Sequence, residues 1–417
     1  NWANNRHYPL RVYSPYVFST VGEAKGLSDL HYDVAVIGLG AMGAATVYQL
    51  AKRGVKVVGI DRFAPPHDQG SSHGDTRITR QAVGEGPAYA PLVRRAQQIW
   101  RELEAETGAQ LFEQCGVLVM TSSTTATSHH GAADFTERTI EQALRYGIDH
   151  ELLNAEQIRA RFPQFAPVLD SATGYFEPGG GYVRPEQCID TQLQLARQQG
   201  AELLTGVTVT KLDAAPEQVT VITDGPTVRA KRVIVSAGMW NAGLLGAPFD
   251  QLLRVCRQKL YWFALQQPSI FPVPSPTFIL SHGPTDEDSC YGFPPLPGEQ
   301  SMKIATEHYA TSVSPDELDR QVSRDECAEM YATQLAGKIA GVTTEVVKSA
   351  VCTYTVTPDY HFIIDQHPSK PNVTVVSACS GHGFKHSAAI GEALAQQVVD
   401  GHSELDLSAF SLARFAH

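Results

Sequence analysis

The hydrophobic pattern is clearest between residues 32 and 61. An apolar run at residues 34–37 leads into Gly38-Leu39-Gly40-Ala41-Met42-Gly43, and apolar residues then recur with helical spacing to about residue 51. A second apolar run at residues 55–60 ends on Asp61. This order of strand, glycine turn, helix, strand and terminal acid is typical of a dinucleotide-binding βαβ unit.

Each residue type in this turn has a physical role toward a nucleotide. Gly38 allows the tight turn, Gly40 lets the backbone approach a pyrophosphate, and Gly43 lets the helix pack against the strand. The N–H groups at the helix start, at Ala41 and Met42, would face the phosphates, and Asp61 would accept from a ribose hydroxyl. The motif predicts an ADP-containing cofactor and fits NAD as well as FAD. The alternative is an ordinary glycine-rich turn in an α/β sheet.

Further elements follow at intervals along the chain. Strand-like runs occupy residues 201–207, 219–222, 233–235 and 373–376, and helical spacing covers 89–107 and about 386–399. Residues 252–351 mix strand-like runs at 260–265 and 277–280 with proline-rich turns. This alternation predicts an α/β fold (α+β overall) in two discontinuous domains. A Rossmann-like domain would comprise residues 31–88, 185–247 and 350–417, and an antiparallel-sheet substrate domain residues 89–184 and 248–349. Residues 1–30 would form an extension.

Length and composition narrow the class of protein. A chain of 417 residues can form two cores, and 43% hydrophobic with 18% charged residues describes a globular protein. No apolar run approaches the roughly 18 residues that span a bilayer. The net charge of −11 argues against nucleic acid and anionic membranes as partners. The seven cysteines form no CxxC pair, so we expect no metal site, no disulfide framework and a reducing, cytoplasmic location.

Five motifs carry a resemblance to a known family. They are Ser71-Ser72-His73-Gly74-Asp75-Thr76-Arg77-Ile78-Thr79-Arg80, Phe176-Glu177-Pro178, Tyr291-Gly292-Phe293-Pro294, Cys352-Thr353-Tyr354 and Ser380-Gly381-His382-Gly383-Phe384-Lys385. From about residue 31 to residue 415 the chain resembles the monomeric sarcosine oxidase and N-methyltryptophan oxidase family. The resemblance implies FAD rather than NAD, and a monomer.

The resemblance also implies where the flavin is held. It implies covalent attachment through Cys352, which by itself would be read as a small buried hydrophobe. Three groups of residues would surround the flavin: Ser72, His73, Thr76 and Arg77; Gly381, Gly383 and Phe384; and Lys385. The second group precedes a helix, so the positive end of that helix would face the flavin edge where negative charge collects on reduction.

Two cations are implied to hold the substrate carboxylate, Arg80 and Lys385. A planar guanidinium suits bidentate carboxylate binding. If residues 76–80 form a helical turn, Arg77 and Arg80 share one face. The alternatives are a solvated basic face for the arginines and an exposed lysine at the start of a helix.

Three further residues are implied to line the reaction site. Lys303 matches a lysine that promotes reaction with oxygen through its charge, although a lone strand lysine more often faces solvent. Tyr291 and Tyr354 match aromatic pocket residues and would otherwise be core tyrosines.

One position departs from the family pattern. Family members usually carry a histidine four residues after this lysine, where Glu307 stands here and His308 follows. Either a local shift keeps His308 in the pocket as a catalytic residue, or Glu307 faces the substrate. A carboxylate there would repel an anionic amino acid and favour a substrate with an extra cation.

These features predict an FAD-dependent oxidase of secondary α-amino acids, which needs no partner besides the amino acid and O2. Hydride transfer to the flavin would give an imine, and O2 would be reduced to hydrogen peroxide. Sarcosine, a bulkier N-methyl amino acid and a cyclic imino acid such as pipecolate or proline all fit. The alternatives are a dehydrogenase that uses another electron acceptor and a non-catalytic nucleotide-binding protein.

Overall fold

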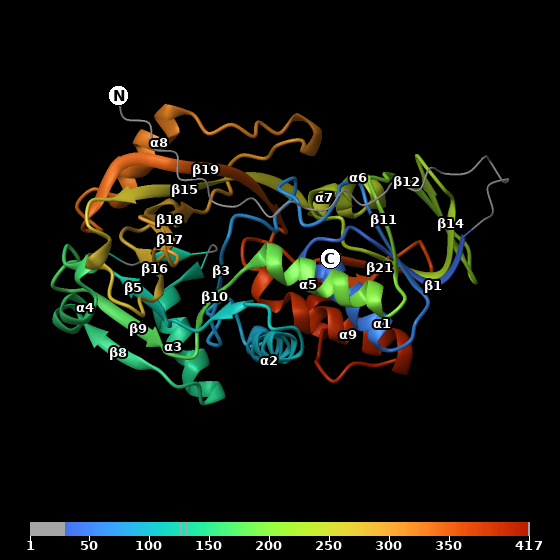
Figure 1. The fold of residues 1–417 in the computed structure, drawn as a ribbon, viewed down its shortest axis with the longest axis horizontal. Helices are drawn as coiled ribbons and strands as arrows, with labels where there is room; N and C mark the ends of the chain where they lie inside the picture. Colours follow the sequence, from blue (N-terminus) through green and yellow to red (C-terminus); the bar gives the residue numbers. More distant parts are fainter. Residues whose placement is uncertain (1–29, 126, 130–131, 416–417) are drawn as a thin grey trace, which may run out of the picture.

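The computed structural model describes residues 30–125, 127–129 and 132–415. The predicted extension lies outside the described residues, except for Leu30, which begins the first strand. Two eight-stranded sheets occupy opposite halves of the molecule, with α2 (Tyr89–Thr107) between them (Figure 1).

One sheet contains the glycine-rich βαβ unit. Its strands are β1 (Leu30–Ile37), β2 (Val57–Asp61), β11 (Glu202–Thr205), β12 (Val209–Ala214), β13 (Val219–Thr223), β14 (Val228–Val235), β20 (Ile363–Gln366) and β21 (Val373–Ser377). The parallel part has the order β11-β2-β1-β14-β21, while β12, β13 and β20 are antiparallel additions. Numbered along the chain, these parallel strands lie in the order 3-2-1-4-5, as in a doubly wound nucleotide-binding sheet. The predicted Rossmann-like fold is therefore confirmed.

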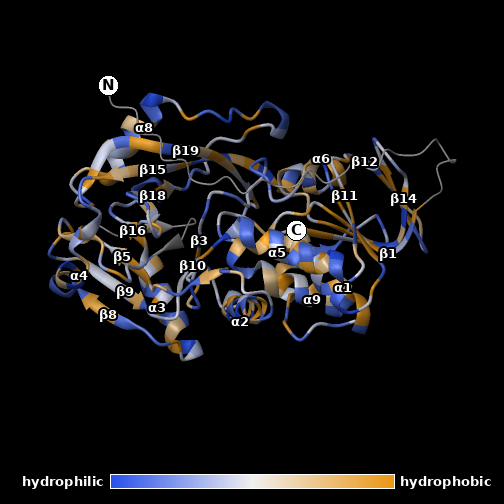
Figure 2. Ribbon diagram, in the orientation of Figure 1, coloured by the Kyte–Doolittle hydropathy of each residue, from blue (hydrophilic) through white to orange (hydrophobic). Residues whose placement is uncertain are grey.

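The apolar run of β1 is continuous because both faces of the sheet are covered. Val34 and Val36 pack in one hydrophobic cluster, and Ala35 and Ile37 pack in another on the opposite face. The first cluster includes residues of α2 and of three helices, α1 (Ala41–Lys52), α5 (Pro185–Gln198) and α9 (Ser387–Asp400). These three lie together on one side of the sheet in Figure 1, and α5 carries both hydrophobic and hydrophilic residues in Figure 2.

The start of α1 depends on close backbone contact. A Cβ atom at Gly43 would lie 1.7 Å from the carbonyl oxygen of Gly38, so only glycine allows this approach of helix and strand. The helix has no side-chain cap from Gly40; instead Ser72 Oγ accepts a hydrogen bond of 3.2 Å from the Ala41 N–H. The motif that begins at Ser71 is thus tied to the beginning of the helix.

The other large sheet is mostly antiparallel. Its strands are β5 (Val117–Thr121), β8 (Glu151–Asn154), β9 (Thr173–Glu177), β15 (Arg254–Leu265), β16 (Thr277–Ser281), β17 (Ser289–Phe293), β18 (Ser301–Thr306) and β19 (Val342–Val356). They lie in the order β19-β15-β18-β17-β16-β5-β9-β8, and only the pairing of β5 with β16 is parallel among these described strands. The predicted boundary between residues 349 and 350 falls inside β19. The four domain boundaries stay predictions.

Shorter elements connect the sheets. The helices are α3 (Phe135–Tyr146), α4 (Ala155–Arg161), α6 (Asn241–Leu245), α7 (Phe249–Leu252) and α8 (Arg324–Met330); the strands are β3 (Arg77–Thr79), β4 (Phe112–Glu113), β6 (Ser128–His129), β7 (Ala132–Ala133) and β10 (Gly181–Val183). Of the helices in the described ranges, none has the length and hydrophobicity that crossing a bilayer requires.

The expected helical turn at residues 76–80 is wrong. Arg77 begins β3, which pairs antiparallel with β10. Neighbouring side chains in an extended segment point to opposite faces, so a separation of three residues does not put Arg77 and Arg80 on one face. The two guanidinium groups accordingly contact different partners.

Candidate active site

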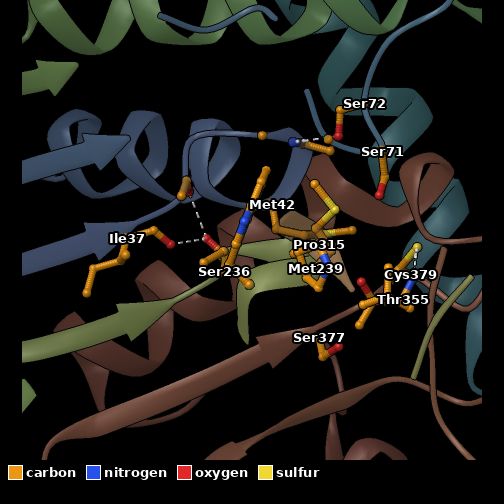
Figure 3. A pocket seen from close by; sticks show the side chains of 18 of the residues that line it. Ile37, Met42, Ser71, Ser72, Ser236, Met239, Pro315, Thr355, Ser377 and Cys379 are labelled. Carbon is orange, nitrogen blue, oxygen red and sulfur yellow. Dashed lines mark hydrogen bonds between the residues drawn. The ribbon is translucent and has the colours of Figure 1, made fainter. Parts of the chain in front are cut away.

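A cavity of about 670 Å³ adjoins the glycine turn. It is lined at one end by residues 38–42 and Asp61, and further along by Ser71, Ser72 and Arg77. Figure 3 shows Met42, Met239 and Ser236 around it, with Ser71 and Ser72, and Cys379 beside Thr355, toward the right of the view. The predicted nucleotide-binding residues therefore line one continuous space, apart from Gly43, which lies behind it against Gly38.

Asp61 lies where a ribose hydroxyl would be bound. Its carboxylate accepts from the backbone N–H of Leu39 at 2.7 Å and of Phe63 at 2.8 Å. His67 Nε2 lies 3.4 Å from Asp61 Oδ1. A carboxylate has about four acceptor positions, so these contacts fix its orientation and leave acceptor capacity toward the cavity.

The far end of this cavity is built by the C-terminal motif. Gly381, Gly383 and Phe384 line it, together with Tyr354 and Thr355 of β19. Gly381 has φ +88, and a Cβ atom there would lie 2.7 Å from the Tyr309 hydroxyl. The cavity is thus lined both by the glycine turn after β1 and by a second backbone turn before α9, and this lining fits FAD.

The loop of residues 71–77 is held by two basic side chains, the partly buried Arg77 and the buried Lys303. Arg77 donates to the carbonyl oxygens of Ser71 at 2.9 Å and Thr76 at 2.8 Å. Lys303 Nζ donates to the carbonyl oxygens of Gly74 and Thr76 and, at 3.3 Å, to Thr76 Oγ1. An ammonium has three donors, so these three acceptors can use all of them. Burial, followed by the charge of Arg77, lowers the pKa of Lys303 well below its ordinary value.

His73 lies in the same loop and is buried. Burial, together with the positive charges of Arg77 and Lys303, lowers the pKa of His73 to about 3. Its Nε2 atom has no hydrogen-bond partner among the described residues. A buried polar atom of this kind is costly unless a bound group satisfies it, which supports a polar cofactor beside this loop.

Cys352 lies beside Arg77 and Lys303 but away from the cavity surface. It is 1% exposed, and burial raises the pKa of its thiol while the two cations oppose that shift. Among the described residues that line the two cavities of this site, Cys352 is absent, whereas Cys379 lines the larger one and accepts from the Thr355 N–H at 3.4 Å.

A second cavity of about 70 Å³ lies next to the first. Both are lined by the same four residues, which are Arg77, Tyr354, Gly381 and Phe384. The smaller one is also lined by Arg80, Lys385 and Tyr291, as the family resemblance implied. The hydroxyl groups of Tyr291 and Tyr354 are 3.1 Å apart, and burial raises the pKa of both, so both are neutral at physiological pH.

Arg80 and Lys385 share a carboxylate in this cavity. Arg80 Nη2 donates to Glu85 Oε2 at 2.9 Å, and Lys385 Nζ lies 3.7 Å from Glu85 Oε1. Burial lowers the pKa of Lys385 to about 8; Glu85 raises it and Arg80 lowers it. The two cations converge on one anion, and this geometry would suit a substrate carboxylate.

The structure resolves the choice between Glu307 and His308 in favour of Glu307. Glu307 lines the small cavity, and Tyr309 donates its hydroxyl to Glu307 Oε2 at 2.9 Å. His308 lines neither cavity; its Nε2 atom lies 3.0 Å from Thr306 Oγ1. Residues of β18 alternate between two clusters, with Ile304 in one and Ala305 in the other, and this alternation continues past the strand. The predicted catalytic placement of His308 is corrected.

Sequence reasoning assigned no role to three glutamates. Glu85 binds the two cations, Glu186 of α5 accepts from the N–H groups of Gly74 and Asp75, and Glu177 accepts from those of Gln81 and Ala82. Glu85 stands five residues after Arg80, and Glu177 lies in one of the motifs that carry the resemblance, so both could have been suspected from the sequence. Glu186 comes from a distant element and has no such signal.

Comparisons with known proteins show the family of this chain. The family model described as FAD dependent oxidoreductase matches residues 33–397. The chain is 38% identical to monomeric sarcosine oxidase of Bacillus sp. (strain NS-129), over 93% of this chain and 97% of that protein. It is 34% identical to N-methyl-L-tryptophan oxidase of Yersinia pestis (strain Pestoides F), over 93% and 100%.

Solved structures share the fold. NikD, an unusual amino acid oxidase essential for nikkomycin biosynthesis, superimposes with a TM-score of 0.78 at 23% identity, covering 92% of this chain and 97% of that one. The L-proline dehydrogenase from P. horikoshii superimposes with a TM-score of 0.75 at 18% identity, covering 93% and 99%. The chain therefore belongs to the FAD-dependent oxidoreductase family.

Proposed function

We propose that the protein is an FAD-dependent oxidase of small secondary α-amino acids such as sarcosine or proline. The observation that carries the proposal is the pair of adjoining cavities. The larger one suits FAD, and the smaller one is lined by Arg80 and Lys385, both directed at a carboxylate. Relatives named monomeric sarcosine oxidase and N-methyl-L-tryptophan oxidase support the same chemistry.

The two cations would bind and orient the substrate. Held by Arg80 and Lys385, the substrate carboxylate fixes the adjacent C–H bond in the direction of the larger cavity, and such orientation lowers the barrier. Glu85 would have to move aside, because its carboxylate now contacts both cations. Bound FAD would supply the hydride acceptor.

The roles that we propose for Cys352 in attaching FAD and for Lys303 in the reaction with O2 are those that the family resemblance implies. Cys352 would be the covalent link to FAD, and its neighbours Arg77 and Lys303 would stabilise a thiolate there. Lys303 would then stabilise negative charge as O2 is reduced to hydrogen peroxide, which requires a fixed cation in a dry site. Its bonds to Gly74 and Thr76 would hold that cation in place.

Cavity size favours a small substrate. The substrate cavity measures about 70 Å³, whereas a cavity of about 150 Å³ is known to hold benzene. An indole ring is larger than benzene, so N-methyltryptophan would need the walls to move. Sarcosine is the smallest of the candidate substrates and would need the least movement of the walls, whereas proline would need more.

A peroxide assay tests the proposal. The purified yellow protein is mixed in air with sarcosine, proline, pipecolate and N-methyltryptophan, and hydrogen peroxide is measured. We expect peroxide with the small substrates and a much lower kcat/KM for N-methyltryptophan. Reduction of an added dye without peroxide would favour the dehydrogenase alternative, and no reaction with any amine would contradict the proposal.

A further inference from the structure

Glu307 is a buried carboxylate in the wall of the substrate cavity. It is 8% exposed and lines the cavity together with Arg80 and Lys385. Tyr309 donates to its Oε2 atom, and its Oε1 atom lies on the side of Gly381, where a Cβ atom would be 3.2 Å away. Since Gly381 lines both cavities, the carboxylate lies near the boundary at which substrate and cofactor would meet.

The cavity therefore contains charges of both signs. Arg80 and Lys385 attract an anion, while Glu307 raises the pKa of Tyr354 and Tyr291 through its negative charge and so acts across the same space. A ligand that matches this pattern is a zwitterion, with its carboxylate toward the two cations and its ammonium toward Glu307.

The volume of the smaller cavity decides whether Glu307 would contact the α-amino nitrogen of the substrate or a second cationic group further along it. A substrate with a second, distant cationic arm needs room beyond the amino acid itself. A space of about 70 Å³ is small even for one amino acid, so it leaves no room for such an arm beyond it. The cation is therefore the α-amino nitrogen of the substrate.

We infer that Glu307 is a specificity-determining residue that binds the amino nitrogen of the substrate and stabilises the positive charge that develops there. This inference rests on the proposed function. As the C–H bond breaks, the hydrogen leaves with its electron pair for bound FAD, and the nitrogen lone pair forms the C=N bond. The ammonium of the zwitterion first loses its proton to water, and the neutral amine then becomes an iminium cation, so a fixed carboxylate stabilises the product side more than the neutral amine.

Two ligands of the same shape, which differ only in the positive charge on the nitrogen, can measure how strongly Glu307 binds that charge. N,N-Dimethylglycine has a protonated nitrogen where 3-methylbutanoate has a carbon, and both carry the carboxylate. Binding to the FAD-loaded protein is measured anaerobically by calorimetry for wild type, Glu307→Gln and Glu317→Gln. Glu317 is exposed, so its substitution removes the same charge without touching the cavity.

We expect Glu307→Gln to weaken dimethylglycine about tenfold, as for other close charge pairs, and to leave 3-methylbutanoate within about twofold. Glu317→Gln should change neither. Anaerobic reduction by sarcosine should also slow in Glu307→Gln. Should that variant lose FAD, Tyr309→Phe, which removes the hydroxyl bonded to Glu307, should shift the same ligand ratio in the same direction.

Equal weakening of both ligands, or no change in either, would overturn the inference. A failure of the proposed function would give a different result. In that case neither ligand would bind to the wild type, and no secondary amino acid would reduce its flavin.

Discussion

Arg80 and Glu85 form a buried ion pair of 2.9 Å inside the substrate cavity, with side chains only 2% and 4% exposed. Lys385 lies 3.7 Å from the other oxygen of the same carboxylate. Glu85 therefore occupies the position toward which a substrate carboxylate would be drawn. Substrate binding would exchange one carboxylate for another rather than bury two bare cations, which would be costly.

Replacing Glu85 by glutamine should separate its contribution to stability from its competition with the substrate carboxylate. Removing one partner of a buried ion pair costs about 3–5 kcal/mol, so the ligand-free protein should melt at a lower temperature. The competing anion is also gone, so 3-methylbutanoate should bind several-fold more tightly. Calorimetric titration and thermal melts measure both. Weaker binding in Glu85→Gln would contradict the competition and indicate that Glu85 positions Arg80 instead.

Carboxylate binding should depend on the charge of Lys385. Its pKa, lowered to about 8 by burial, means that Lys385 is an ammonium below pH 8 and loses its charge as the pH rises above it. The Kd of 3-methylbutanoate, which stays anionic throughout, should therefore be constant near pH 7 and rise above pH 8. In Lys385→Met the Kd should be higher and show no rise at this pH. A flat wild-type profile from pH 7 to pH 9.5 would exclude this role.

Lys303 and Lys348 offer a matched pair of lysines on opposite sides of one ring. Lys303 Nζ lies 5.4 Å from the centre of the Trp262 ring and is buried, while Lys348 Nζ lies 4.4 Å from it, bonds to Asp75 and is half exposed. Lys303→Met should slow reoxidation of the reduced protein by O2 more than it slows reduction by substrate. Stopped-flow absorbance measures both rates.

The Lys348→Met variant is the control for the loss of charge beside Trp262. It should reoxidise at the wild-type rate. Equal slowing of reduction and reoxidation in Lys303→Met would mean that Lys303 only anchors the loop through Gly74 and Thr76.

The site of covalent attachment can be tested on two cysteines. Cys352 is the residue that the family resemblance implies, yet Cys379 is the one that lines the larger cavity. After acid precipitation, the flavin should remain with the polypeptide in wild type and Cys379→Ser, and should be released from Cys352→Ser. Release from Cys379→Ser alone would assign the link to Cys379.

Much of the fold could be predicted because it rests on local signals. The limits of α2 and the βαβ unit follow from apolar periodicity and from a glycine turn, both of which are readable over 10 to 20 residues. The short segment from Arg77 to Arg80 carries no such signal. Its strand conformation comes from pairing with β10, about a hundred residues later, which no local pattern contains.

The sequence identified many of the residues that line the candidate site, but it did not predict the contacts that those residues make. Arg80, Lys385, Tyr291 and Tyr354 do line one cavity. The role of Glu186 could not be predicted, because a carboxylate on the surface and one that holds a loop look alike in sequence, and only the distance from Arg80 in the sequence could have pointed to Glu85. To decide which of Glu307 and His308 lines the cavity, one had to know to which face each side chain points after the end of β18.

The most direct test of the account is a single turnover without oxygen. The yellow protein is mixed anaerobically with sarcosine or proline, its flavin absorbance is followed, and air is then admitted while hydrogen peroxide is measured. We predict bleaching by these substrates, then full recovery of the colour with about one peroxide per flavin. A protein that holds FAD but is bleached by no secondary amino acid would contradict the account.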